Sequence, residues 1–181
     1  SFDFPMLRGM RRLRYNVAAT LDGFIAGPDD EFDWIPHDET IDFEALFAEF
    51  DTFVMGRRTW GVTAAQGLEN PLAGRRVVVV SRTLAPEAAP GTTIVREGVV
   101  EAVARLKAEE GKDVWLFGGG ALFRTLLDAG LVDTVEVAVT PVLLGGGVPL
   151  VTPGARGPAL RLVSCRTLPS GIVMLAYDVE R

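Results

Sequence analysis

Four consecutive valines, in the stretch RRVVVVSR at residues 75–82, place the strongest constraint on how this chain can fold. A strand with one face in water alternates apolar and polar residues, and this stretch does not alternate. β-Branched side chains favour extended backbone, so the stretch predicts a central strand that is covered on both faces. A sheet with a layer on each side needs a sizeable core, and one domain of 181 residues is long enough to bury it.

The segments around the valines alternate between strand and helix patterns. Short apolar runs predict strands, and apolar residues at helical spacing predict helices. The predicted strands cover residues 11–19, 52–56, 75–82, 113–117 and 134–143. The predicted helices cover residues 38–50, a segment that begins near residue 58, and residues 99–109 and 121–130. Residues 159–168 and 172–180, separated by a PSG turn, predict a terminal antiparallel hairpin.

This order of elements predicts an α/β fold in a single domain over residues 10–181, with an N-terminal extension at residues 1–9. The central sheet is expected to be mostly parallel, with helices on both of its faces. In open α/β sheets, ligands bind beyond the carboxyl ends of the strands. The strand ends are therefore the first place to look for a functional site.

Charge and composition exclude several classes of function. The formal net charge of −6 disfavours broad binding to nucleic acid, because phosphate backbones bind basic faces. No apolar run approaches the roughly 20 residues that span a bilayer, and the start, SFDFPMLRGMRRLR, does not resemble a secretory signal. The one cysteine, Cys165, allows no internal disulfide, which suits the cytoplasm, and its strand pattern predicts a buried, inert thiol. Without a His/Cys cluster or a calcium-loop spacing, we expect no metal site.

Glycine-rich or basic sequences follow three of the predicted strands, in VMGRRTW (54–60), VVVVSR (77–82) and VWLFGGGALF (114–123). Glycine lets the backbone approach a ligand closely, and the free N–H groups of a first helical turn bind anions. Serine and arginine at a neighbouring strand end suit a further phosphate, such as the 2′-phosphate of NADPH. Each sequence alone also fits an ordinary turn. Together they predict a dinucleotide site.

In order and spacing, VMGRRTW, VVVVSRT and VWLFGGGALFRTLL resemble the dihydrofolate reductase superfamily over nearly the whole chain. Within it, TLDGFIAG (20–27) and PVLLGGGVPL (141–150) look more like the C-terminal reductase domain of the riboflavin-biosynthesis protein RibD than like true dihydrofolate reductases. The resemblance implies a three-layer dihydrofolate reductase-like fold. It also implies NADPH as the cofactor.

The resemblance implies which residues surround that cofactor. They are Ala18 and Ile25 beside the nicotinamide, Gly56, Arg57, Arg58 and Thr59 at the phosphates, Ser81 and Arg82 at the 2′-phosphate, and Gly118, Gly119, Gly120, Ala121 and Leu122 over the pyrophosphate and nicotinamide. Ala18 and Ile25 belong to the first strand and the loop after it, and the other positions come from all three of the strand ends described above.

The resemblance implies fewer residues for proton transfer and substrate binding. In true dihydrofolate reductases a carboxylate on the helix after the first loop supplies or relays the proton. Asp38 lies at a suitable place for that carboxylate, and Asp42, one turn further on the same predicted helical face, is the alternative match. In the riboflavin-type branch, Asp22 and Trp34 lie beside the substrate. We therefore predict Asp22 and Asp38 as catalytic, and Asp22, Trp34 and Asp42 as substrate-binding; for the three acids, an ordinary solvated turn is the alternative.

The function that the resemblance implies is hydride transfer from NADPH to a small heterocyclic or ribosylated substrate. The nearest model is the reduction of 5-amino-6-(5-phosphoribosylamino)uracil in riboflavin biosynthesis. Two alternatives remain open: a reductase of dihydrofolate or another pterin, and a nucleotide-binding module without turnover. A second basic cluster in the pocket would favour a phosphorylated substrate. Homodimers are usual in the riboflavin-type branch, so we expect one here.

Overall fold

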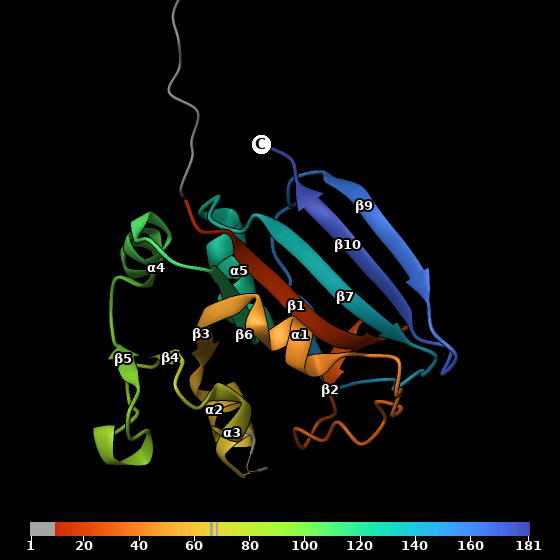
Figure 1. Ribbon diagram of the computed structural model, residues 1–181, viewed down its shortest axis with the longest axis horizontal. Helices are drawn as coiled ribbons and strands as arrows, with labels where there is room; N and C mark the ends of the chain where they lie inside the picture. Colours follow the sequence, from red (N-terminus) through yellow and green to blue (C-terminus); the bar gives the residue numbers. More distant parts are fainter. Residues whose placement is uncertain (1–9, 66, 68) are drawn as a thin grey trace, which may run out of the picture.

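The computed structural model describes residues 10–65, 67 and 69–181, so the extension predicted at residues 1–9 lies outside the described part (Figure 1). An eight-stranded sheet runs through the molecule. Its strands, in spatial order, are β5 (Thr93–Val95), β4 (Arg76–Val80), β3 (Phe50–Gly56), β6 (Asp113–Gly118), β1 (Leu13–Thr20), β7 (Thr134–Thr140), β10 (Val173–Val179) and β9 (Leu160–Thr167). The pairs from β5 to β7 are parallel, and the pairs β7–β10 and β10–β9 are antiparallel. The predicted fold class is confirmed.

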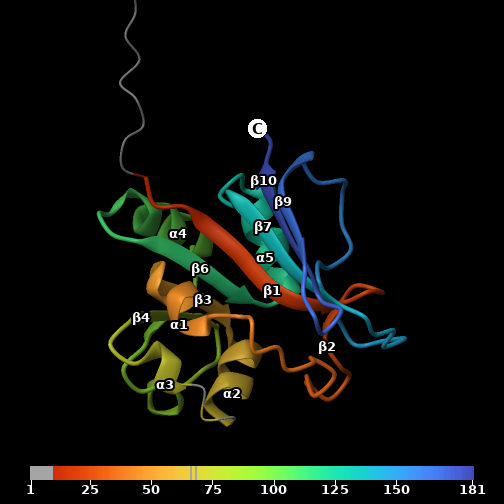
Figure 2. The ribbon, with the colours of Figure 1, turned by 45° about the vertical axis from the view of Figure 1, so that its right-hand side comes forward.

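Helices cover both faces of this sheet (Figures 1 and 2). α4 (Val99–Ala108) and α5 (Gly120–Asp128) pack on one face. α1 (Phe43–Ala48), α2 (Arg57–Ala65) and α3 (Glu69–Leu72) pack on the other. The valines of β4 serve both layers, because Val78 belongs to the first core while Val77 and Val79 belong to the second. The absence of alternation in the sequence therefore reflects burial on two sides.

Two buried aromatic residues, one on each face of the sheet, hold neighbouring segments in place near the ends of the strands. Tyr15 of β1 is fully buried, stacks on Phe123 of α5 with ring centroids 3.8 Å apart, and donates a hydrogen bond to the Leu150 carbonyl at 2.7 Å. On the opposite face, Trp115 of β6 packs against Phe50 at 4.7 Å and donates to the Asn16 carbonyl at 2.8 Å. Tyr15 thus fixes the segment that follows β8 (Val148–Pro149), and Trp115 fixes the part of the sheet that lies under α1.

The helix predicted over residues 38–50 is wrong in extent. The Asp38 side chain accepts hydrogen bonds from the N–H and hydroxyl of Thr40, which makes a local turn instead of helix. Asp42 is the N-cap of α1, where its side chain accepts from the Ala45 N–H at 2.9 Å. Phe50 already begins β3. Asp38 and Asp42 therefore do not share a helical face.

Other differences concern short or exposed strands. The predicted elements did not include β2 (Phe24–Ala26), β5 or β8, and β2 pairs with β8 in a small separate sheet. The prediction of a buried Cys165 is wrong, since every residue of β9 is exposed. None of the helices in the described part of the chain is long and apolar enough to cross a membrane.

Candidate active site

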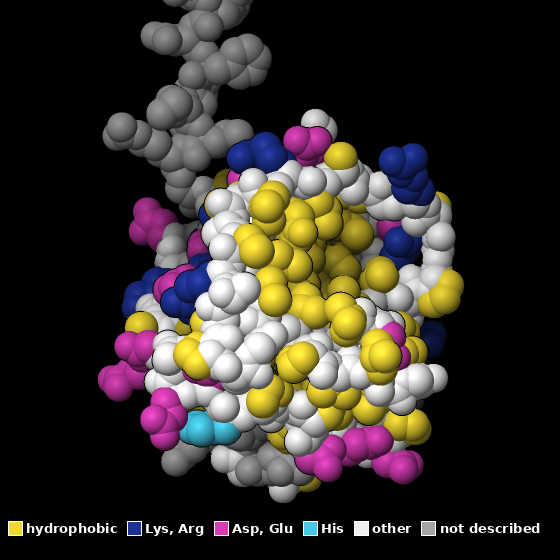
Figure 3. All heavy atoms as spheres, turned by 90° about the vertical axis from the view of Figure 1, so that its right-hand side faces the viewer, with side chains coloured by type: hydrophobic (Ala, Val, Ile, Leu, Met, Phe, Trp, Pro, Cys, Tyr) yellow, Lys and Arg dark blue, Asp and Glu magenta, His cyan; other side chains and the backbone are white. Residues whose placement is uncertain are grey.

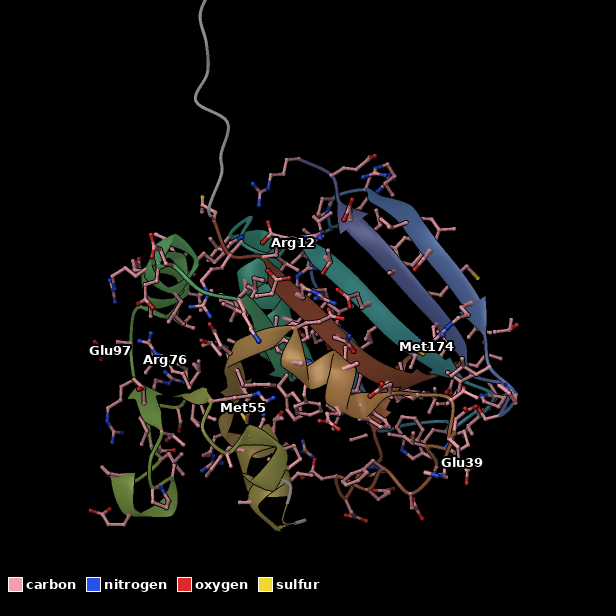
Figure 4. All side chains as sticks on the ribbon, viewed as in Figure 1. Arg12, Glu39, Met55, Arg76, Glu97 and Met174 are labelled. Atoms are coloured by element: carbon pink, nitrogen blue, oxygen red, sulfur yellow. The ribbon has the colours of Figure 1, made fainter. Side chains whose placement is uncertain are left out.

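A cavity of about 1310 Å³ opens at the carboxyl ends of the parallel strands. Its floor includes Ala18 of β1 and Ala138 of β7, which are direct partners in the sheet, and Met174 of β10 beside them. Met174 lies near the lower end of β10 in Figure 4. The small alanine side chains leave space above the sheet. One end of the cavity reaches the glycine turn after β6, and the other reaches α1.

The glycine turn between β6 and α5 has little room for side chains at two of its three positions. Gly118 has φ +142°, a conformation that favours glycine, and a Cβ on Gly120 would lie 2.4 Å from the Pro149 carbonyl oxygen. Gly119 differs, because its Cβ would meet nothing closer than the Thr59 hydroxyl at 3.8 Å. The peptide between Gly118 and Gly119 is cis. All three glycines line the cavity.

The start of α2 lies beside this turn. β3 runs through Gly56 directly into α2, and Met55 is in register with Gly118 of β6. The nine-residue helices α2 and α5 therefore begin at neighbouring points on the cavity wall. The first N–H groups of a helix have no partner within it and carry the positive end of its dipole. This end of the cavity suits an anionic group such as a pyrophosphate.

The two arginines at the start of α2 differ in their contacts. Arg58 forms an ion pair with Asp30 and donates to the Pro28 carbonyl at 3.3 Å, which links the loop after β2 to α2 across the cavity. Arg57 makes a long contact of 3.5 Å with the Thr83 hydroxyl, beyond the end of β4. Both side chains are exposed and line the cavity.

Ser81 and Arg82 lie outside the cavity lining, at the end of β4. The Ser81 hydroxyl accepts hydrogen bonds from the N–H groups of Thr83 and Leu84 at 3.2 and 3.0 Å, which shapes the turn. The Arg82 side chain is exposed, and Arg96, which follows β5, donates to the Arg82 and Leu84 carbonyls at 3.0 and 2.9 Å. Sequence reasoning missed Arg96 because it did not recognise β5.

The other end of the cavity is mostly apolar. Phe43, Leu46 and Phe47 of α1 face Ile172 and other apolar residues across it. Trp115, buried in the sheet, also lines this end, with its ring centroid 4.9 Å from that of Phe47. A single tryptophan inside a buried strand resembles any other core residue, so its sequence carried no signal of this position.

Asp38 is the buried carboxylate at this end, 7% exposed. Its Oδ1 accepts from the Thr40 N–H at 2.9 Å and from the Thr40 hydroxyl, and its Oδ2 accepts from the Ser170 N–H at 3.0 Å. The hydrogen bonds from Ser170 and Thr40 hold the pKa of Asp38 well below its usual range. Asp38 is therefore ionised at neutral pH and places a negative charge in the cavity lining.

The remaining predicted substrate residues do not line the cavity. Asp22 accepts hydrogen bonds from the Thr20 hydroxyl and from the N–H groups of Leu144 and Gly145 at 3.1 and 2.7 Å. Those bonds, from Thr20 first, lower the pKa of Asp22 to about 2 and fix the loop before β8. The Trp34 indole donates to the Glu31 carbonyl at 3.1 Å, and Asp42 caps α1. The predicted cofactor residues other than Ser81 and Arg82 all line the cavity.

Comparisons with known proteins agree with the architecture. The model of the RibD C-terminal domain family matches residues 11–174. An uncharacterised Bacillus subtilis protein, YyaP, is 34% identical over 179 residues, covering 92% of this chain and 94% of its own. A putative riboflavin biosynthesis protein from Shewanella superposes with a TM-score of 0.81 at 27% identity, over 95% of this chain and 100% of that one.

The wider fold extends to true dihydrofolate reductases. An Enterococcus faecalis dihydrofolate reductase, in complex with NADP(H), superposes with a TM-score of 0.68 over 94% of this chain and 97% of that enzyme. Its identity of 16% supports the shared fold alone. The resemblance expected from the sequence is confirmed: this chain belongs to the RibD C-terminal domain family, a family of reductases with the dihydrofolate reductase-like fold.

Proposed function

We propose that this chain is an NADPH-dependent reductase that delivers hydride to a small heterocyclic or ribosylated substrate. The observation that carries the proposal is the convergence of two helix N-termini and a glycine turn on one cavity whose other end is apolar. The glycine end suits the phosphates of a dinucleotide, and the apolar end suits a flat organic acceptor. Both reactants would share one enclosed space.

The residues at the glycine end fit the cofactor. Gly119 leaves room for a pyrophosphate to approach the backbone, since only the Thr59 hydroxyl lies within 4 Å of where its Cβ would be. Arg57 would neutralise phosphate charge, and Arg82 with Arg96 would hold the 2′-phosphate that distinguishes NADPH from NADH. Ser81 would position that turn through the bonds its hydroxyl already accepts.

NADPH, when bound, supplies the hydride, so the protein has to align the two reactants and exclude water. Ala18 and Ile25 line the middle of the cavity, where a nicotinamide ring reaching out from the glycine end would lie against the sheet. Asp38 is the carboxylate that we propose contacts the substrate. Asp22 would act at a distance, by holding the loop of residues 144–145.

Cofactor choice tests the proposal directly. NADPH should quench tryptophan fluorescence, because Trp115 lines the cavity, and it should bind at least tenfold tighter than NADH. Arg82→Ala should remove most of that preference, while Arg105→Ala removes an equal charge from the exposed face of α4 and should leave it intact. Equal, weak binding of the two nucleotides by the unchanged protein would refute the assignment.

Turnover separates the candidate reactions. NADPH oxidation, followed by absorbance, should be measured with the riboflavin-pathway phosphoribosylaminouracil, dihydrofolate and dihydropterins. Oxidation with a pterin alone would favour the folate-type alternative. Tight NADPH binding without oxidation across the panel would favour a nucleotide-binding module.

We further propose a homodimer that forms through the outer strands β9 and β10. Leu160, Leu162 and Val163 of β9 are 44%, 52% and 56% exposed, and hydrophobic side chains gather on this side of the molecule (Figure 3). Exposed apolar patches of this kind mark interfaces. Leu162→Lys should convert a dimer to a monomer in sedimentation measurements, and a monomeric parent protein would refute the proposal. We also propose that the protein is cytoplasmic, because a free thiol such as that of Cys165 suits a reducing compartment.

A further inference from the structure

We propose that the substrate of this site is a planar heterocycle without a phosphate group, neutral or positively charged. The inference rests on the proposed function, because it takes the glycine end as the cofactor's and the α1 end as the substrate's. It departs from the phosphoribosylated compound that served as the nearest model. The distribution of charge around the cavity carries it.

The arginines that line the cavity lie at one end. Among the described residues of the lining, Arg57 and Arg58 are the only Lys or Arg side chains, and both belong to the first turn of α2. Arg58 is already paired with Asp30. At the α1 end, the buried charge is the Asp38 carboxylate, and the exposed His37 is its neighbour in the chain. The substrate end is therefore net acidic where the cofactor end is basic.

The nearest arginine on the cavity side of β1 is not available to a ligand. Arg14 donates to both carboxylate oxygens of Glu136 at 2.7 and 2.8 Å, and it also pairs with Glu49. Glu136 accepts a further bond at 2.9 Å from the side chain of Asn16, which lines the cavity. Burial raises the pKa of Glu136, but hydrogen bonds and charge from Arg14 outweigh it and lower the pKa overall. This network adds negative charge beneath Asn16 and no free cation.

Arg166 of β9 is the other cation to consider. It is the direct partner of Met174 in the sheet, so the two side chains share a face. Arg166 is nevertheless exposed and is not part of the cavity lining. A phosphate inside the α1 end would thus meet a buried carboxylate without a compensating cation, which is strongly unfavourable.

The same surfaces favour a flat ring. Phe43, Phe47 and Trp115 offer aromatic faces, and Met174 offers a polarisable side chain on the floor. Asp38 Oδ1 already accepts two hydrogen bonds, while Oδ2 accepts one and keeps a lone pair for a ring N–H. An ionised carboxylate that can accept one more bond selects a donor-bearing heterocycle and disfavours an anionic one.

A matched pair of ligands tests the inference: a ribosylaminouracil and its 5-phosphate, which differ only in the phosphate. Calorimetric titration of the full chain, without cofactor and then with saturating NADP⁺, should give at least tenfold tighter binding of the unphosphorylated compound. Equal or tighter binding of the phosphate ester would overturn the inference. NADPH binding, read by fluorescence on the same sample, tests the proposed function separately, so a failure there leaves the ligand preference measurable.

A charge variant tests the cause of the preference. Met174→Lys puts a cation on the cavity floor and should improve binding of the 5-phosphate relative to its partner by at least tenfold. Thr125→Lys adds the same charge on the exposed side of α5, on the other face of the sheet, and should leave the ratio unchanged. A ratio that Met174→Lys leaves unaltered, in a variant that still melts cooperatively and binds NADPH, would overturn the charge argument.

Discussion

Alanine substitution at two neighbouring glycines should separate the stability of the glycine turn from its binding role. In Gly120→Ala, the new Cβ would lie 2.4 Å from the Pro149 carbonyl oxygen and 3.2 Å from that of Leu150. Both are backbone atoms, so the end of β8 and the residue after it must move. Overpacking of this kind costs about 1–3 kcal/mol, which corresponds to a fall in Tm of about 2–12 °C for a domain of this size.

Gly119→Ala should behave in the opposite way. Its φ of −105° is ordinary for alanine, and its Cβ would lie 3.8 Å from the nearest atom, the Thr59 hydroxyl. Its stability should therefore stay within about 0.5 kcal/mol of the parent protein. The Cβ would keep a phosphate from the backbone, and each charge-assisted hydrogen bond lost costs about 1.5–3 kcal/mol, or about 10–150-fold in Kd for NADPH.

Thermal unfolding and fluorescence titration with NADPH measure the two effects on the same samples. Gly146→Ala is the control, because no atom lies within 4 Å of the position of its Cβ, and it should alter neither quantity. Parental melting of Gly120→Ala would show that the backbone of Pro149 and Leu150 moves aside at no cost, which would refute the overpacking argument. Parental NADPH affinity of Gly119→Ala would refute the role of the turn as the pyrophosphate seat.

Three further predictions concern stability. Gly61→Ala, at an exposed site in α2 with nothing near its Cβ, should raise the free energy of unfolding in urea by about 0.5–1 kcal/mol. Lys107→Met should lower it by about 3–5 kcal/mol, because the Lys107 ammonium is buried against Asp133 and the Leu131 carbonyl; a neutral result would mean that the pair contributes nothing. The hydrogen bonds from Thr20 and then Gly145 lower the pKa of Asp22 to about 2, so its stabilising effect is present above about pH 4 and is lost as the pH falls toward 2. Asp22→Asn should flatten that part of the stability profile, and an unchanged slope would contradict the assignment.

Local patterns in the sequence predicted the parts of the fold that depend on local properties. The valines of β4 could be read as buried on both faces because no polar residue interrupts them. The glycine turn and the start of α2 could be expected together, since the carboxyl ends of parallel strands meet at one edge of a sheet. The same reasoning could not detect β5, whose three residues carry too short a pattern.

The positions of the two predicted catalytic aspartates depend on contacts with distant parts of the chain, which local sequence patterns do not reveal. Asp38 looked like an acid in a first helical turn, yet it is buried and accepts a hydrogen bond from Ser170, 132 residues further along the chain. Asp22 looked like a substrate residue, yet its partners come from Leu144 and Gly145 in a distant loop. Neither partnership leaves a trace in the residues beside the aspartate. Only the folded chain distinguishes a carboxylate in the cavity from one that secures a loop.

The ion pair between Arg58 and Asp30 has a thermodynamic consequence. A phosphate bound at the start of α2 would compete with Asp30 for the same guanidinium, so cofactor affinity and the attachment of the loop become linked quantities. Such linkage is reciprocal: whatever weakens the attachment favours the cofactor, and the bound cofactor weakens the attachment to the same extent. The loop that borders the cavity would then report, through its own mobility, whether the dinucleotide has arrived.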